Sequence, residues 1–386
     1  MPAMNYGDIV ATVPVSVPYA RRADCGAEWF LARALAALLD GSGLAKGAID
    51  GLCASSFTLA PDTSVALTQH VGLSPRFLEW LPVGGACGVI ALRRAARAVQ
   101  AGDAAVVACI AGDTAHASGF RDLLAGFSRF SRNAVYPYGA GGANGSFALI
   151  TAAYMHQYGA TREDFGRMCV AQRANARHNP HALLRGELTL PDYLAARPIA
   201  APLHLFDCVM PCAGADGFLV MTQARAQSLG LRGVRVLAAI ERHHAFPDDP
   251  VQLRGGWAVD RDALWAQAGI GPAAIDLVQT YDDYPVMSMM QLEDLGFCGK
   301  GEGPDFVRRH DLTIGGDFPL NTGGGQLSVG QAGAAGGYLG LVEAMRQLTD
   351  AVPERAVARA RHALVSGFGM INYDRGLCSA ACVLAR

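Results

Sequence analysis

The sequence predicts an α/β protein built from two similar halves, residues 1–228 and 229–386, with a loop domain inserted at about 113–205. Two observations predict this architecture. Apolar runs of strand length alternate along the chain with longer amphipathic segments, which is typical of sheets covered by helices. A pattern of glycine, alanine, isoleucine and aspartate at residues 43–52 recurs at 269–278, each time just before a short apolar run, which indicates an internal duplication.

Individual elements follow from the local patterns. Residues 104–111 form an apolar run that ends at Gly112 and Asp113, so we expect a buried strand followed by a loop. The preceding segment, 88–100, carries apolar residues on one face and arginines on the other, which predicts an amphipathic surface helix. A small-residue helix at 334–348 and an apolar run at 363–371 repeat this order in the second half.

The region 113–205 has no counterpart in the second half. It is rich in glycine, aromatic residues, arginine and histidine, a composition that is typical of loops that shape a pocket. Two interpretations of its aromatic residues stay open, a wide apolar pocket and a small core of the loop domain itself. The residues concerned are Phe120, Phe127, Phe130, Tyr136 and Tyr138.

Composition excludes several classes of function. The chain is 51% hydrophobic and 17% charged, so much of its surface is expected to lie in a core or an oligomer interface. A net charge of −2 without a basic run argues against nucleic acid or an anionic membrane as a partner. There is no signal-peptide pattern and no apolar run long enough to span a membrane, so we expect a cytoplasmic protein. The 10 cysteines lie mostly within apolar segments, typical of reduced thiols, and no metal site is expected.

The most informative stretch is 321–337, in which a glycine-rich loop runs directly into a helix of small residues. Glycine tolerates the turns such a loop needs, and backbone N–H groups at a helix start can bind an oxyanion. Asn321, Gly324 and Gly330 are therefore candidate substrate-binding residues. The stretch resembles the Asn-x-x-Gly-Gly…Gly-His-Pro motif of the thiolase superfamily, but Gln331 stands where the catalytic histidine belongs.

The resemblance to thiolases spans essentially the whole chain. The segments 171–190, 207–220 and 291–305 are similar to the sterol-carrier-protein-x branch of that superfamily. The resemblance implies a duplicated thiolase fold with five αβαβα layers and a homodimer. It also implies acyl-CoA substrates, with coenzyme A entering as part of the substrate and no other cofactor bound.

The thiolase nucleophile position is occupied by a glycine. In thiolases the cysteine opens a helix as Cys-x-x-Gly, and this pattern places Gly85 at the nucleophile position. Cys87 lies two residues later, where a helix dipole would stabilise a thiolate. Cys87 is therefore a candidate displaced nucleophile, and a packed small residue is the alternative.

The oxyanion-hole motif of the family is replaced by Tyr-Asp-Asp-Tyr at 281–284, directly after the strand expected at 275–280. Tyr281 can donate a hydrogen bond to a thioester or enolate oxygen, and it is the candidate donor or base. A tyrosine that merely caps the strand end is the alternative.

The last thiolase motif, Cys-x-Gly-Gly-Gly, is also altered. Asn372 is expected at or beside the second cysteine position, and Tyr373 is the nearest group able to carry a proton. Ordinary packing at the end of the sheet is the alternative for Tyr373. Gln331 cannot exchange a proton at neutral pH, but it can bind an enolate oxygen.

These replacements remove the groups that thiolysis requires, and retro-aldol cleavage fits what remains. That reaction needs a base for a β-hydroxyl and donors for an enolate, but no acyl-enzyme. The chain resembles the thiolase-like aldolases of bacterial steroid side-chain degradation, which lack the cysteine and rely on tyrosines. Those enzymes work with a small OB-fold/zinc-ribbon subunit, so such a partner is implied here. Two alternatives stay open, an acyltransferase acting on an unusual β-ketoacyl-CoA through Cys87, and a catalytically silent subunit.

Overall fold

A computed structural model of the chain describes residues 6–115 and 142–386. The five aromatic residues expected to line a pocket or form a small core, Phe120 to Tyr138, lie outside the described residues. Within the described ranges, no helix is long and apolar enough to cross a membrane.

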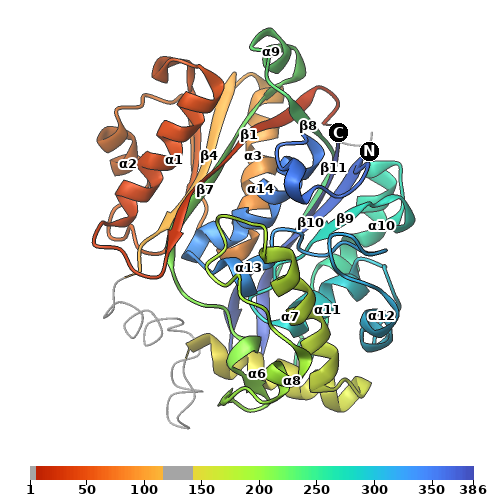
Figure 1. The fold of residues 1–386 in the computed structure, drawn as a ribbon. Coiled ribbons are helices and arrows are strands. Elements are labelled where there is room, and N and C mark those ends of the chain that lie inside the picture. The colour runs from red at the N-terminus through yellow and green to blue at the C-terminus, as the bar shows by residue number, and fades with distance from the viewer. Residues whose placement is uncertain (1–5, 116–141) are drawn as a thin grey trace.

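One nine-stranded sheet forms the centre of the molecule, with the strand order β3-β2-β4-β7-β1-β8-β11-β10-β9 (Figure 1). The first half of the chain supplies β1 (Ile9–Ala20), β2 (Gly51–Ser55), β3 (Phe77–Trp80), β4 (Val106–Asp113) and β7 (Ala213–Thr222). The second half supplies β8 (Gly233–His243), β9 (Leu277–Gln279), β10 (His362–Asn372) and β11 (Arg375–Ala385). The two parts meet at a short antiparallel pairing of β1 with β8.

The strand pairing repeats on both sides of this junction. Outward from β1 the order is β7, β4 and β2, with two antiparallel pairings followed by a parallel one. Outward from β8 the order is β11, β10 and β9, with the same directions. The sheet therefore has the internal duplication that the sequence predicts.

The repeated sequence pattern has the same structural role in both halves. Gly43 ends α1 (Ala27–Ser42) and Gly269 ends α10 (Trp257–Ala268), both in the left-handed conformation that glycine favours. The aspartate of each copy then holds the start of a strand. Asp50 accepts the N–H of Val106 at the start of β4, and Asp276 accepts the N–H of His362 at the start of β10.

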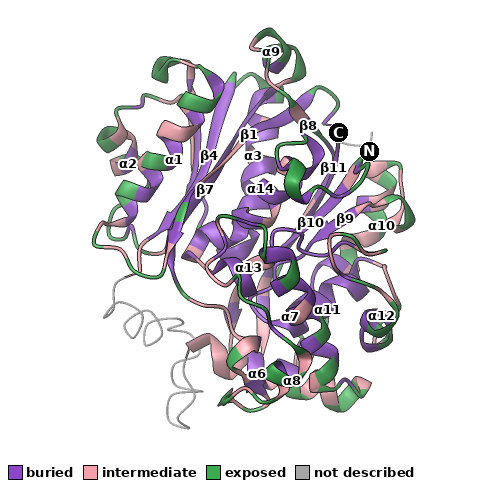
Figure 2. Cartoon of the chain, viewed as in Figure 1, coloured by how far each residue is buried: buried purple, intermediate pink, exposed green. Residues whose placement is uncertain are grey.

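Helices on both outer faces and a central pair of helices complete five layers (Figure 1). The helix α1 packs on β1, β4 and β7, and α10 packs on β8 and β11. Between the two parts of the sheet lie α3 (Cys87–Ala101) and α14 (Gly336–Leu348), which pack against each other. Figure 2 shows that these two helices and the strands β2, β4, β7, β10 and β11 are largely buried. The αβαβα prediction is confirmed.

The prediction that residues 88–100 form a surface helix was wrong in position. The helix α3 has the expected bounds, but it lies in the central layer, in contact with strands of both halves. The helix still has a polar edge, where Arg93 and Arg94 both bind the carboxylate of Glu241 on β8. A two-sided pattern alone does not tell a surface helix from a central one that has a polar edge.

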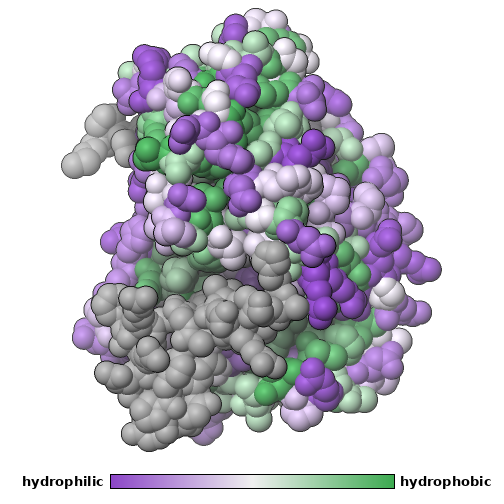
Figure 3. All heavy atoms as spheres, turned by 90° about the vertical axis from the view of Figure 1, so that its left-hand side faces the viewer, coloured by the Kyte–Doolittle hydropathy of each residue, from purple (hydrophilic) through white to green (hydrophobic). Residues whose placement is uncertain are grey.

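The outer face carried by α1 and α2 (Ser64–Val71) mixes hydrophilic and hydrophobic residues (Figure 3). Its exposed large hydrophobic side chains include Trp29 and Val65.

The described part of the inserted region is mostly helical. It forms α6 (Gly142–Tyr158), α7 (Arg162–Ala176), α8 (Leu190–Leu194) and a hairpin of β5 (Pro198–Ala200) and β6 (Leu203–His204). The remaining helices are α9 (Gln223–Ser228), α11 (Pro285–Asp294), α12 (Gly303–Arg309) and α13 (Gly325–Val329). Because α7 packs on α13, the insertion supports the glycine-rich loop from outside.

Candidate active site

Tyr281 lies just beyond the end of β9, and its backbone is fixed on both sides. The side-chain amide of Gln291 on α11 accepts the N–H of Tyr281 at 3.1 Å and donates to its carbonyl oxygen at 2.8 Å. The phenol oxygen accepts a hydrogen bond from Nε2 of Gln331 at 3.0 Å. The structure thus brings together two of the residues that the sequence singles out.

The aromatic ring of Tyr281 occupies the space that a nucleophilic cysteine would need. A Cβ atom added to Gly85 would lie 1.9 Å from Cε2 and 2.1 Å from Cζ of Tyr281, far inside van der Waals contact. No side chain at position 85 is compatible with this ring. The lack of a side chain at Gly85 is therefore explained by the placement of Tyr281.

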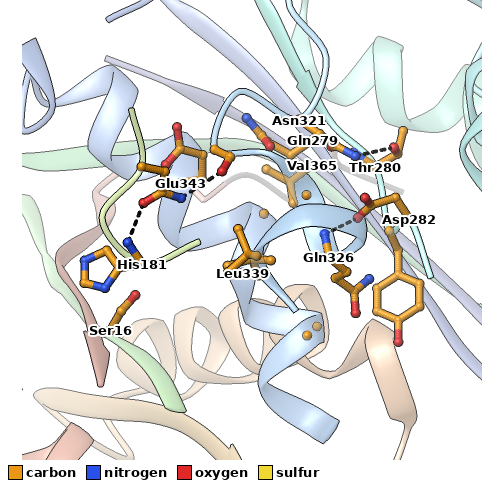
Figure 4. Close-up of a pocket in the computed structure, with 18 of the residues that line it drawn as sticks. Ser16, His181, Gln279, Thr280, Asp282, Asn321, Gln326, Leu339, Glu343 and Val365 are labelled. Carbon is orange, nitrogen blue, oxygen red and sulfur yellow. Dashed lines mark hydrogen bonds between the residues drawn. The ribbon is translucent and has the colours of Figure 1, made fainter. Parts of the chain in front are cut away.

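A pocket that is lined in part by Tyr281 opens at the end of β9. Figure 4 shows the residues around it. It is bounded by the end of β9, the glycine-rich loop, the start of α14, and Val365 and Ser366 of β10. Ser16 and Tyr19 of β1 close it on another side, together with Asn179 and His181. In Figure 4, Asp282 and Gln326 lie together at one side of the pocket, and Ser16 and His181 lie at the opposite side.

The glycine-rich loop takes the conformation that its sequence predicts, and only some of its candidate residues reach the pocket. Gly324 and Gly330 have φ angles of 103° and 112°, which a residue with a side chain rarely adopts. They face Ala176 and Cys212, and neither lines the pocket. Asn321 lines it, but its Oδ1 accepts the N–H of Thr280 at 2.8 Å, which fixes the loop to the end of β9.

Two buried carboxyl groups follow Tyr281. Burial raises the pKa of Asp282 to about 7, although its carboxylate accepts backbone N–H groups from Gln326 and Leu327. Burial and the neighbouring charge of Asp282 raise the pKa of Asp283 well above its ordinary value. A carboxyl group with a pKa near neutrality can both accept and release a proton under physiological conditions.

Tyr281 is a neutral phenol in this setting. Burial raises its pKa well above the ordinary value, and the charge of Asp283 adds to the effect. The hydrogen bond from Gln331 opposes the shift and uses a lone pair of the phenol oxygen. The O–H bond of Tyr281 can therefore donate to a substrate oxygen, whereas a role as general base is disfavoured.

Cys87 is not placed as a nucleophile would be. The side chain is fully buried, and its Sγ donates to the carbonyl oxygen of Ala334 at 3.2 Å. Burial raises the pKa of the Cys87 thiol to about 12, so the helix start at this residue does not produce a thiolate. Cys87 does not line the pocket.

The structure does not bring Asn372 and Tyr373 to Gly85. The strand β10 passes Gly85 at Gly367, where an added Cβ would lie 2.7 Å from the Gly85 carbonyl oxygen. It then continues in regular pairing with β11 to Asn372, so both residues are carried to the hairpin turn. Tyr373 is 46% exposed there, with a φ of 62°. Counting residues along a motif does not reveal where the strand turns, which is why the position expected for Asn372 and Tyr373 from the sequence was wrong.

Most of the residues that line the pocket were not among the sequence candidates, and Asp282, Ser366 and Gln326 are examples. Asp282 lies within the motif that pointed to Tyr281, Ser366 lies on β10 beside Gly367, and Gln326 follows directly after three glycines. The signal for Gln326 was a polar side chain inside a run of glycine and apolar residues. Its meaning depends on burial, which the sequence alone does not reveal.

Within residues 6–115 and 142–386, no group of three or more His, Cys, Asp or Glu side chains is arranged to hold a metal ion. The fold and the pocket together define a thiolase-like protein. Comparison with known proteins places it more narrowly. Residues 252–378 match the family model described as thiolase C-terminal domain-like.

Two curated relatives cover most of the chain. A 17-hydroxy-3-oxo-4-pregnene-20-carboxyl-CoA lyase of Mycobacterium tuberculosis is 34% identical over 86% of this chain and 88% of its own length. A steroid side-chain-cleaving aldolase of Thermomonospora curvata is 34% identical over 81% of this chain and 82% of its own length. A solved structure titled Ltp2-ChsH2(DUF35) aldolase superposes with a TM-score of 0.83 at 25% identity, over 98% of both chains. The chain belongs to the thiolase superfamily, in the family of thiolase-like lyases that includes these relatives.

Proposed function

We propose that the protein cleaves the carbon–carbon bond between Cα and Cβ of a β-hydroxyacyl-CoA by a retro-aldol reaction, without an acyl-enzyme. The observation that carries the proposal is the Tyr281 ring, which fills the space of the thiolase nucleophile and leaves a neutral phenol beside the pocket. The names of the two relatives, a carboxyl-CoA lyase and a side-chain-cleaving aldolase, support the same reaction.

The reaction divides into two proton movements. A base takes the proton of the β-hydroxyl, and the oxygen forms a carbonyl as the Cα–Cβ bond breaks. The electron pair of that bond moves into the thioester, which becomes an enolate. Protonation of Cα then gives a shorter acyl-CoA beside a ketone or aldehyde, and donors aimed at the enolate oxygen lower the barrier.

We assign Asp282 as the base and Tyr281 as a donor to the enolate oxygen. Because its pKa is raised to about 7, Asp282 can accept a proton near neutral pH, and Asp282 lines the pocket. Gln331 holds the phenol in position through its 3.0 Å hydrogen bond. Tyr373 has no step in this scheme, because it lies half exposed at the hairpin turn.

The acyltransferase alternative requires a thiolate at Cys87. Burial of that thiol, with its pKa raised to about 12, argues against such a thiolate. The silent-subunit alternative requires an inert pocket, and the perturbed carboxyl groups beside Tyr281 argue against it.

The comparison with a solved structure also supports a proposal about partner subunits. The structural neighbour is titled as a complex of two named components, Ltp2 and ChsH2(DUF35). We infer that this chain likewise works with a partner subunit, of the OB-fold/zinc-ribbon kind, and that it forms a homodimer. The relatives' names make a steroid-sized acyl group the first substrate to test.

The test is turnover of 17-hydroxy-3-oxo-4-pregnene-20-carboxyl-CoA, with the ketone and the shorter acyl-CoA measured by mass spectrometry. Tyr281→Phe should lower kcat/KM by at least about 100-fold, the usual scale for a positioned donor. Cys87→Ala is the matched control and should retain activity with no acyl adduct in either protein. A covalent acyl adduct that disappears in Cys87→Ala would refute the proposal and establish an acyltransferase.

A further inference from the structure

One polar side chain in the pocket is buried without a partner. Gln326 is only 2% exposed, it lines the pocket, and neither its Nε2 nor its Oε1 has a hydrogen-bond partner among the described residues. Buried amides are normally paired, because an unpaired donor loses its hydration without compensation. An unpaired amide directed at a substrate pocket indicates a group that pairs with the ligand.

The surroundings of Gln326 fix where this amide lies. Its backbone N–H is bound by Asp282 at 2.9 Å, and its carbonyl oxygen accepts the N–H of Gly330 at 2.9 Å. A Cβ on Gly336 would lie 2.3 Å from Oε1 of Gln326 and 3.4 Å from Cγ of Gln331. Both glutamine side chains therefore lie next to Gly336, and its lack of a side chain leaves room for them.

The two glutamines differ in what they already bind. Nε2 of Gln331 donates to the phenol of Tyr281, so Gln331 orients that tyrosine. The backbone N–H of Gln326 donates to the Asp282 carboxyl group (Figure 4), whereas its side-chain amide has no hydrogen-bond partner among the described residues. Gln326 is thus the glutamine whose donor is available to a substrate oxygen.

We propose that Gln326 is a catalytic residue whose Nε2 donates to the thioester oxygen of the substrate, beside the phenol of Tyr281. The inference rests on the proposed acyl-CoA lyase function and adds a second donor to it. The pair binds the oxygen as a carbonyl in the substrate and more strongly as an enolate oxygen, because charge develops there as the Cα–Cβ bond breaks.

A matched control exists elsewhere in the chain. Gln172 of α7 is 1% exposed, and both of its amide atoms also lack a partner among the described residues. It does not line the pocket. Gln172→Met and Gln326→Met therefore make the same chemical change, but only the second removes a donor from the pocket.

The test compares binding of butyryl-CoA with binding of S-butyl-CoA, a thioether that lacks the carbonyl oxygen. Neither compound carries a β-hydroxyl, so neither is cleaved, and both affinities follow from isothermal titration calorimetry. Wild type and Gln172→Met should prefer the thioester by about 10-fold, the scale of one or two hydrogen bonds. Gln326→Met should show a smaller preference, because only the Tyr281 phenol then remains to donate to the carbonyl oxygen, and its kcat for the steroid ester should fall by about 100-fold.

The outcomes separate the inference from the function on which it rests. If wild type and Gln326→Met show the same preference, the inference fails while thioester binding stands. If wild type binds neither compound nor the steroid ester, the lyase function fails as well. Melting temperatures decide whether the amide is structural. A lower melting temperature in both Gln326→Met and Gln326→Leu would show that it holds the fold and would overturn the inference, whereas an unchanged or higher value supports it.

Discussion

The fit between Gly85 and Tyr281 allows a quantitative prediction for Gly85→Ala. The new Cβ would lie 1.9 Å from Cε2 of Tyr281, whereas carbon atoms pack at about 3.5 Å, so the ring must move by roughly 1.6 Å. Overpacking of this kind costs about 1–3 kcal/mol of unfolding free energy. A displacement of that size also breaks the 3.0 Å hydrogen bond from Gln331 and misaligns the phenol, which should lower kcat/KM by about 100-fold.

Urea denaturation of four proteins tests the reasoning. These are wild type, Gly85→Ala, Tyr281→Ala and the double variant. Once the ring is removed, the added methyl group has space, so Gly85→Ala should cost almost nothing in the Tyr281→Ala background. The expected coupling energy is about 1–3 kcal/mol. Gly47→Ala is the control, because an added Cβ there meets nothing within 4 Å. Equal destabilisation by Gly85→Ala in both backgrounds would refute the contact.

Two further predictions concern pH and buried charge. As the base, Asp282 must be deprotonated, so kcat/KM should rise as the pH increases through about 7. If an Asp282→Asn variant shows the same rise, the titrating group is another residue. Arg355→Met should lower the unfolding free energy by about 3–5 kcal/mol in urea, because it leaves the buried carboxylate of Glu343 without its paired cation. The exposed pair of Arg76 with Asp50 is the comparison, and Arg76→Met should cost less than about 1 kcal/mol.

The sequence by itself determined the fold class, the duplication and the location of the glycine-rich loop 321–337, which borders the pocket. Local sequence patterns are sufficient to predict these features. Gly43 and Gly269 end helices in the left-handed conformation, Asp50 and Asp276 hold strand starts, and the repeated pattern required two equivalent units. The order of residues also singled out Gln331 and Tyr281, which the structure brings into hydrogen-bond contact.

Only the tertiary structure decided which side chains meet. The central position of α3 depends on contacts with both parts of the sheet, and the pattern of one helix cannot reveal it. The absence of a side chain at position 85 became meaningful when the Tyr281 ring, 196 residues later in the chain, was found in that space. Burial, a property of the assembled core, kept Cys87 a thiol, raised the pKa of Asp282 to about 7 and left the Gln326 amide without a partner. Long-range packing sets the dielectric surroundings and the available hydrogen-bond partners, and so it decides which polar residues take part in chemistry.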